Sequence, residues 1–270
     1  MNFSEYGNPS GKPVVYFHGV PGSPIEASVF ESSARALGLR VLCFDRFSID
    51  PSVSGALYYQ RIAQAIDEAV RGTPVDFIGF SIGSHVALEV CRQMPGRVKS
   101  LHLVSAVAPL DEGDFLNEMA GKGVFSLARN RPVLFSGLAK SQALLASLLP
   151  GVLARLLFAS AAGQDKALAS QPAFRTLMKD VLQSCFTQGA SGYIRDINQF
   201  LAPWSAGIFE CEASVHLWHG THDNWSPVAM ADYLARAFPG GVTMERLQGG
   251  SHYSCLLDAA AKICLQLSSA

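Results

Sequence analysis

The sequence contains few charged residues and no excess of either sign. Lysine and arginine total 21, against 22 aspartate and glutamate residues, and charged residues make up only 16% of the chain. A general nucleic-acid-binding protein carries a basic patch, and no basic stretch interleaved with aromatic residues occurs here. We therefore expect no nucleic-acid partner.

Paired cysteines are also lacking. The cysteines are scattered, with no Cys-x-x-Cys pair and no spacing typical of metal ligands. We predict buried, reduced thiols, no metal site and no cofactor. The histidines at 216, 219 and 222 have no matching carboxylate cluster, so we expect them to serve packing and hydrogen bonding. The six cysteines are Cys43, Cys91, Cys185, Cys211, Cys255 and Cys264.

The sequence has no uninterrupted apolar run of membrane-spanning length. Its first residues show no basic segment followed by an apolar one, so we expect no signal peptide and a cytoplasmic location. The most apolar stretch, residues 144–162, is interrupted by Pro150 and Gly151 and contains Arg155. We predict two buried helices there and no membrane span.

Apolar residues are nevertheless abundant, at 49% of 270 residues, which is enough for one large α/β domain or a core with an insertion. Runs that are apolar throughout alternate with amphipathic helical patterns. This alternation predicts a doubly wound, mostly parallel sheet covered by helices on both faces. Strands are predicted at residues 14–17, 40–44, 75–78, 98–104, 215–218 and 242–247, and helices at 24–37, 59–70, 82–94, 228–238 and 254–267.

The alternation stops between Pro109 and Pro203. This stretch has no strand signal, and apolar residues recur at helical spacing from Phe174 to Cys185. We predict a helical cap over residues 109–203. It is inserted into an α/β core that is formed by residues 1–108 and 204–270.

A candidate nucleophile lies in the sequence Gly79-Phe80-Ser81-Ile82-Gly83. Parallel sheets collect their chemistry on loops at the carboxyl ends of strands, and this segment joins a predicted strand to a predicted helix. The G-x-S-x-G pattern alone is a weak signal. In a strand–turn–helix context, however, it is typical of a nucleophile elbow, whose tight turn projects the serine hydroxyl from the sheet. We predict Ser81 as the nucleophile.

A serine hydroxyl needs an adjacent base, and the base needs a carboxylate to orient it. His252 lies in a glycine-rich loop after the last predicted strand, and Asp223 follows the fifth predicted strand. We predict Ser81, Asp223 and His252 as a catalytic triad. Asp111 and Asp114, after the fourth predicted strand, remain alternatives for the acid.

Acyl transfer also needs two backbone donors for the oxyanion. The N–H of Ile82, which follows the nucleophile, is one candidate. By position, the N–H of Val20 in the loop after the first predicted strand is the other. The aromatic residues Phe80, Trp225 and Tyr253 lie beside the triad in the sequence, and we predict them to bind substrate.

These segments together resemble the α/β-hydrolase superfamily. Residues 17–23 look like its H-G-x-P-G oxyanion loop, 79–83 like its elbow, 219–223 like its acid loop and 250–252 like its histidine loop. The resemblance implies a capped hydrolase with a serine nucleophile. Residues 45–52 depart from it, because they lack both glycines of the corresponding family loop. Little chain precedes the first predicted strand, so we also expect a shortened N-terminal edge of the sheet.

The predicted cap is rich in leucine, phenylalanine and methionine. Neither the cap nor the loop that carries Asp223 contains a cluster of arginine or lysine that could bind an anion. We therefore predict a carboxylesterase-like serine hydrolase with an uncharged, partly apolar, small-molecule acyl substrate, acting as a monomer or homodimer. Thioesters and amides are less favoured substrates. The alternatives are a C–C bond hydrolase or an iminopeptidase with the same triad, a cofactor-free oxygenase that uses the His–Asp pair, and a ligand receptor without enzymatic activity.

Overall fold

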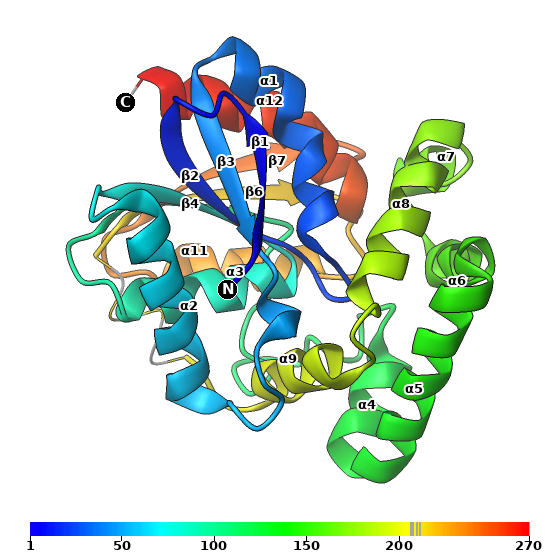
Figure 1. Cartoon of the computed structure of the whole chain (residues 1–270). Coiled ribbons are helices and arrows are strands. Elements are labelled where there is room, and N and C mark those ends of the chain that lie inside the picture. Colours follow the sequence, from blue (N-terminus) through cyan, green and yellow to red (C-terminus); the bar gives the residue numbers. More distant parts are fainter. Residues whose placement is uncertain (206–207, 209, 211, 270) are drawn as a thin grey trace.

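The computed structural model describes residues 1–205, 208, 210 and 212–269. A seven-stranded sheet forms its centre, in the order β1-β3-β2-β4-β5-β6-β7 (Figure 1). β1 is antiparallel to β3, and all the other neighbouring pairs are parallel. The predicted mostly parallel sheet is confirmed. The strands are β1 (Phe3–Gly7), β2 (Lys12–Phe17), β3 (Leu39–Phe44), β4 (Val75–Phe80), β5 (Val98–Val104), β6 (Ser214–Gly220) and β7 (Val242–Leu247).

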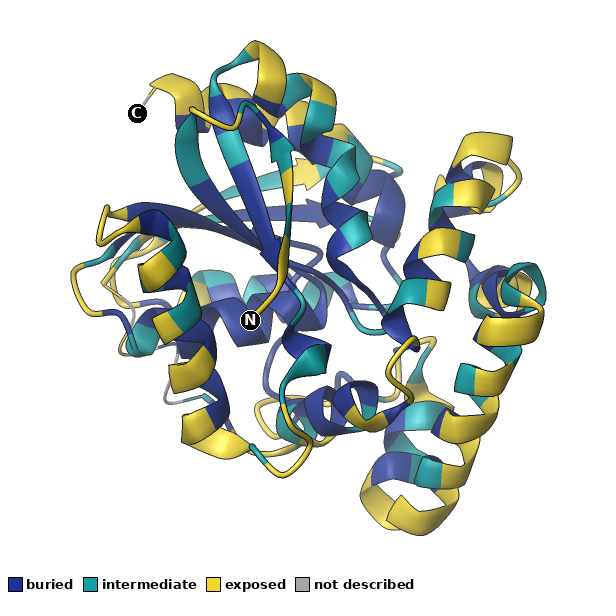
Figure 2. Ribbon diagram, viewed as in Figure 1, coloured by how far each residue is buried: buried dark blue, intermediate teal, exposed yellow. Residues whose placement is uncertain are grey.

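Helices cover both faces of this sheet, as the alternating pattern predicted. α1 (Glu31–Ala36) and α12 (His252–Ser269) pack together on one face. α2 (Gly55–Val70), α3 (Ile82–Arg92) and α11 (Val228–Ala237) lie on the other (Figure 1). Because the central strand β4 is covered on both sides, all its residues are buried (Figure 2).

β1 was not predicted from the sequence. Its residues alternate between exposed and part-buried positions, and it contains Ser4 and Glu5, so it has no continuous apolar run. Such a half-exposed edge strand gives a weak sequence signal. It is the single strand that precedes β2, in agreement with the expected short N-terminal edge. The predicted helix at 24–37 is also split, into a 3₁₀ helix (Pro24–Phe30) and α1.

The chain between β5 and β6 is helical, with no strand among residues 105–205. These helices lie beside and below the sheet (Figure 1). The inserted helical region is thus confirmed, while the division into a core and a separate cap unit stays a prediction. The helices are α4 (Lys122–Asn130), α5 (Pro132–Leu148), α6 (Pro150–Leu157), a 3₁₀ helix (Phe158–Ser160), α7 (Asp165–Leu168), α8 (Pro172–Cys185) and α9 (Ser191–Leu201).

Residues 144–162 form two helical segments that meet at Pro150, as predicted, but the prediction that they are buried is wrong. Leu144, Leu148 and Leu156 are 61%, 67% and 61% exposed, and the outer sides of α5 and α6 are exposed in Figure 2. A pattern that is apolar around the whole helix does not reveal which side faces solvent. No helix in the described part of the chain is long and apolar enough to span a bilayer.

Five of the six cysteines are described, and all five are buried, as predicted. Cys211 lies outside the described residues.

Candidate active site

Close packing of the backbone fixes the turn that carries Ser81. Ser81 joins β4 to α3 with a φ of 55° and a ψ of −129°, a backbone conformation that is unfavourable for a residue with a side chain. A Cβ at Gly79 would lie 2.7 Å from the Ser84 Cα, and one at Gly83 would lie 2.2 Å from the Phe17 carbonyl oxygen. Glycine is therefore required at both positions, and α3 begins close against the end of β2.

Asp223 and His252 form a hydrogen-bonded pair from two different elements. Asp223 follows β6, His252 is the first residue of α12, and the distance from Nδ1 to Oδ2 is 2.8 Å. The other carboxylate oxygen accepts the backbone N–H groups of Trp225 and Ser226, each at 2.9 Å. Both members of the pair are buried. The carboxylate is thus fixed in position and can orient the imidazole.

Each member of this pair shifts the pKa of the other. Burial alone would lower the pKa of His252, but the charge and hydrogen bond of Asp223 outweigh burial and raise it. Burial would raise the pKa of Asp223, and the charge and hydrogen bond of His252 hold it below its ordinary value. Burial lowers the pKa of the nearby His219, whose Nε2 lies 2.8 Å from the Ser226 carbonyl oxygen. Among the described residues, His252 is therefore the candidate general base.

The Phe80 ring connects the elbow to this pair, with its centroid 4.8 Å from that of His252. Among the described residues the Ser81 hydroxyl has no hydrogen-bond partner, so no Ser81–His252 hydrogen bond is formed. Catalytic hydrogen bonds are often long without substrate and tighten when it binds. The alternative acids Asp111 and Asp114 are exposed and do not contact His252.

The two predicted oxyanion donors border the same cavity as Ser81. Val20, Ser81 and Ile82 all line it. The N–H of Gly19 donates to Glu26 Oε2 at 2.8 Å, so it is not available to a ligand. The N–H groups of Val20 and Ile82 have no acceptor within the described structure. Both are therefore available to an oxyanion.

Sequence reasoning missed Glu26, which is buried behind the oxyanion loop. Its carboxylate accepts the N–H of Gly19, the Tyr16 hydroxyl at 2.8 Å and the Tyr253 hydroxyl at 3.3 Å. Burial raises the pKa of Glu26, and these hydrogen bonds partly offset that rise. Glu26 thus connects the loop that carries Val20 to the residue after His252. A lone glutamate in a helical pattern gives no sequence signal for such a position.

A buried ion pair joins the helical insertion to the oxyanion loop, and sequence reasoning missed it too. Arg46 Nε lies 2.8 Å from Asp196 Oδ2, in α9, and Arg46 Nη2 donates to the His18 carbonyl oxygen at 2.9 Å. The Tyr58 hydroxyl donates to the other Asp196 oxygen at 2.8 Å. Both charged side chains are almost wholly buried. The loop that departs from the family pattern therefore anchors α9.

We expect Asp196→Asn to lower the free energy of unfolding by about 3–5 kcal/mol, because the Arg46 guanidinium would stay buried without its carboxylate. Equilibrium unfolding in urea measures the change. The matched control is Asp67→Asn, in the exposed pair with Arg97, where we expect a change below about 1 kcal/mol. Equal effects of the two substitutions would contradict an anchoring role for the Arg46–Asp196 pair.

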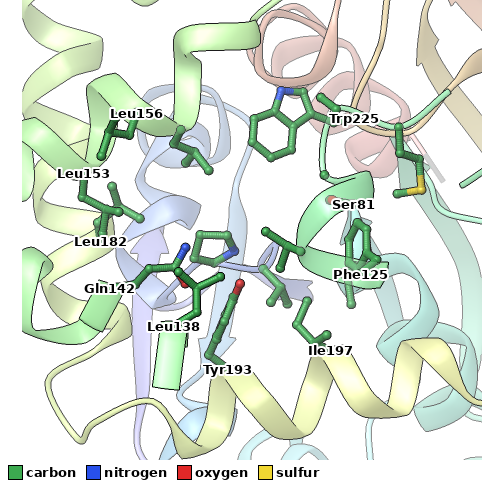
Figure 3. Close-up of a pocket in the computed structure, with 18 of the residues that line it drawn as sticks. Ser81, Phe125, Leu138, Gln142, Leu153, Leu156, Leu182, Tyr193, Ile197 and Trp225 are labelled. Carbon is green, nitrogen blue, oxygen red and sulfur yellow. The ribbon is translucent and has the colours of Figure 1, made fainter. Parts of the chain in front are cut away.

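The cavity above Ser81 has a volume of about 380 Å³. The insertion supplies most of its lining, with leucines of α5, α6 and α8 across the cavity from Ser81 (Figure 3). None of the described residues that line it is charged. Its polar side chains are Ser81, Ser141, Gln142, Ser160, Tyr193 and Ser226. The site therefore suits an uncharged, mainly apolar ligand.

Only one of the three predicted substrate-binding aromatics lines this cavity. Trp225 lies in its wall (Figure 3). Phe80 and Tyr253 are instead buried against each other, 5.0 Å between centroids, and both pack on His252. They hold the imidazole and do not line the cavity, which corrects the prediction. No group of three or more His, Cys, Asp or Glu side chains within the described chain is arranged to hold a metal ion.

Comparison with known proteins gives a consistent picture of the fold. The family profile of the alpha/beta hydrolase fold matches residues 12–259. A bromoperoxidase from Bacillus anthracis has a similar structure, with a TM-score of 0.69 and 18% identity, covering 99% of this chain and 94% of that one. For an esterase from Exiguobacterium antarcticum the TM-score is 0.68 and the sequence identity is 17%, and the match covers 99% of this chain and 93% of that one. For Est816, described as an N-acyl homoserine lactone degrading enzyme, the TM-score is 0.67 and the sequence identity is 17%. This match covers 99% of this chain and 95% of that one. No curated protein matches the sequence.

Proposed function

Because the chain belongs to the alpha/beta hydrolase fold family, we propose that it is a serine hydrolase that cleaves uncharged, partly apolar carboxylic esters. The observation that carries the proposal is the buried Asp223–His252 pair beside a strained Ser81, all at the carboxyl ends of the strands. Similar structures include an esterase and a lactone-degrading enzyme, and they support this class of reaction only through the shared fold.

In the proposed reaction, His252 takes the Ser81 proton as the hydroxyl oxygen attacks the ester carbonyl carbon. The oxyanion accepts hydrogen bonds from the N–H groups of Val20 and Ile82. His252, now an imidazolium stabilised by Asp223, protonates the alcohol as it leaves and an acyl-enzyme remains on Ser81. His252 then activates a water molecule, which releases the acid and restores the serine.

The uncharged cavity supports an ester substrate over a charged one. An iminopeptidase needs acidic groups to hold a substrate amine, and the candidates Asp111, Glu112 and Asp114 are exposed and do not line the cavity. The leucines of the wall favour an aliphatic or aromatic acyl group, because its burial there removes apolar surface from water. Trp225 is the proposed aromatic contact for it.

We expect kcat/KM for p-nitrophenyl esters to rise about fourfold with each added CH₂ of the acyl chain, which corresponds to about 0.8 kcal/mol per buried CH₂. The rise should stop when the chain fills the cavity of about 380 Å³. Leu153→Trp, which narrows the cavity wall, should move the optimum to a shorter chain. Leu57→Trp, on the exposed side of α2, should leave it unchanged.

Labelling by a fluorophosphonate probe provides the accompanying test of Ser81. Labelling of the folded wild type without turnover of any ester would favour a C–C bond hydrolase or a ligand receptor. A folded wild type that is not labelled would contradict an activated serine. Native activity that survives in Ser81→Ala would favour an oxygenase that uses the His252–Asp223 pair.

A further inference from the structure

The outer surface of α5 and α6 carries a cluster of exposed apolar side chains. The exposed leucines of α5 are Leu134, Leu138, Leu144 and Leu148, and Leu138 and the part-buried Leu145 also line the cavity. Phe135, Ala139 and Ala146 lie on another side of α5 and are buried. We call the exposed cluster the leucine rim: Leu134, Leu138, Leu144, Leu148, Leu149 and Leu156, each at least 36% exposed.

The leucine rim shares two residues with the wall of the cavity above Ser81. Leu138 and Leu156 belong to the rim and also line the cavity, where Figure 3 labels both of them. Val133, which is 83% exposed, extends the apolar surface at the start of α5. Monomeric proteins rarely expose large contiguous apolar patches without an interaction partner. The rim is therefore placed to receive a molecule that also enters the cavity.

Within the chain segment that carries the leucine rim, every charged residue is basic. No acidic residue occurs from Met119 to Gln164, whereas the whole chain has slightly more acidic than basic residues. The basic residues of this segment are all exposed, and no ion pair in the described structure involves them. They are Lys122, Arg129, Arg131, Lys140 and Arg155.

A second basic feature lies beside α6. A small cavity of about 120 Å³ is lined by Arg155, Arg175 and Lys179, together with apolar atoms of Phe158 and Met178. Asp180 is the nearest acidic residue along α8, and it is not part of this cavity wall. Three cations around a small cavity suit an anionic headgroup.

We infer that the leucine rim docks on an anionic lipid surface, with the leucines in the acyl boundary and the surrounding cations at the headgroups. This is the pattern of helices that lie in a membrane interface without spanning it. A second copy of the chain fits less well, since a two-fold contact would oppose identical basic surfaces with no acidic residue between them. The inference does not depend on the proposed function, because docking requires neither Ser81 nor hydrolysis.

Vesicle sedimentation with the full chain tests this inference. We expect binding to vesicles of mixed phosphatidylglycerol and phosphatidylcholine, weak binding to phosphatidylcholine alone, and weaker binding as salt increases. Arg129→Gln, Arg131→Gln and Lys140→Gln should each reduce the partition coefficient about fivefold. The triple variant Leu134→Ser/Leu144→Ser/Leu148→Ser should reduce it by about a hundredfold or more.

Matched controls lie on surfaces away from the rim. Leu57→Ser, Leu265→Ser and Arg61→Gln remove exposed residues of the same kinds from α2 and α12 and should bind vesicles like the wild type. Ser81→Ala should also bind like the wild type, which separates docking from catalysis. All rim variants should keep their thermal midpoint and, if the esterase proposal holds, their rate on a soluble short-chain ester.

Three results would overturn the inference. One is a failure to bind anionic vesicles, and another is equal binding to neutral vesicles. The third is a concentration-dependent dimer in light scattering that the triple leucine variant abolishes, because the occupant of the rim would then be a second copy of the chain.

Discussion

Ser81→Ala is expected to lower kcat/KM for the best p-nitrophenyl ester by about four to six orders of magnitude. The substitution removes the attacking oxygen and leaves the cavity and the backbone donors of Val20 and Ile82 in place. The residual rate should therefore stay above the uncatalysed rate, because oxyanion stabilisation and substrate binding remain. Steady-state kinetics at substrate concentrations well below KM measure the change.

The Ser81 variant also allows a structural control. Alanine at a φ of 55° is no more strained than serine, so the thermal midpoint should change little. Ser84→Ala removes a neighbouring hydroxyl that donates to the Ser81 carbonyl oxygen, and it leaves the nucleophile intact. A loss of rate in Ser84→Ala as large as in Ser81→Ala would indicate that the elbow geometry, and not the Ser81 hydroxyl, accounts for the activity.

Asp223→Asn is expected to lower kcat by about 10⁴-fold and to shift the pH dependence of what remains. An amide at this position no longer selects the imidazole tautomer that leaves Nε2 free to accept the serine proton. It also removes the charge that raises the pKa of His252. Both effects act on the base and leave Ser81 itself unchanged.

The direction of the pH shift follows from the two causes that act on His252. The base must be neutral, so wild-type activity should increase as pH rises through an apparent pKa above the ordinary value of about 6.5. In Asp223→Asn, the imidazole stays buried while the carboxylate is lost, so the increase of activity with pH should occur at lower pH. If activity increased at the same pH in both proteins, this would contradict the pairing of Asp223 with His252. Asp111→Asn is the control, because Asp111 is exposed and should leave the profile unchanged.

The sequence predicted the parts of the fold that have a strong periodic signal. The covered strands β2 to β6 each contain a short, mainly apolar run, and amphipathic helices follow most of them, so the order of elements follows from the pattern. β1 alternates and lies at an edge, and it was missed for that reason. The exposure of α5 was misjudged because its leucines occur on several sides of the helix, and only the surrounding structure decides which sides are covered.

For the candidate site, the sequence could identify residues that lie at strand ends but not those that position them. The Asp223–His252 contact was expected from loop position, and the two residues are joined by a hydrogen bond. Glu26 and the Arg46–Asp196 pair lie in segments without a motif, and their roles come from contacts between distant parts of the chain. Phe80 and Tyr253 were expected in the cavity because they flank the triad, yet neighbouring residues in a strand or helix point in different directions.

β5 and β6 are neighbours in the sheet, with Ser100 opposite Ser214, although the whole helical insertion separates them in the sequence. The entropy cost of closing a loop grows only slowly with the length of the loop, so the long insertion lowers the stability of the sheet only a little. The insertion does affect the order in which the strands pair, because contacts between residues distant in sequence form after local contacts. During synthesis the five strands β1 to β5, with Ser81 at the end of β4, emerge first. His252 and Asp223 can join them only after the insertion has emerged, so a partly synthesised chain contains the proposed nucleophile without the proposed base.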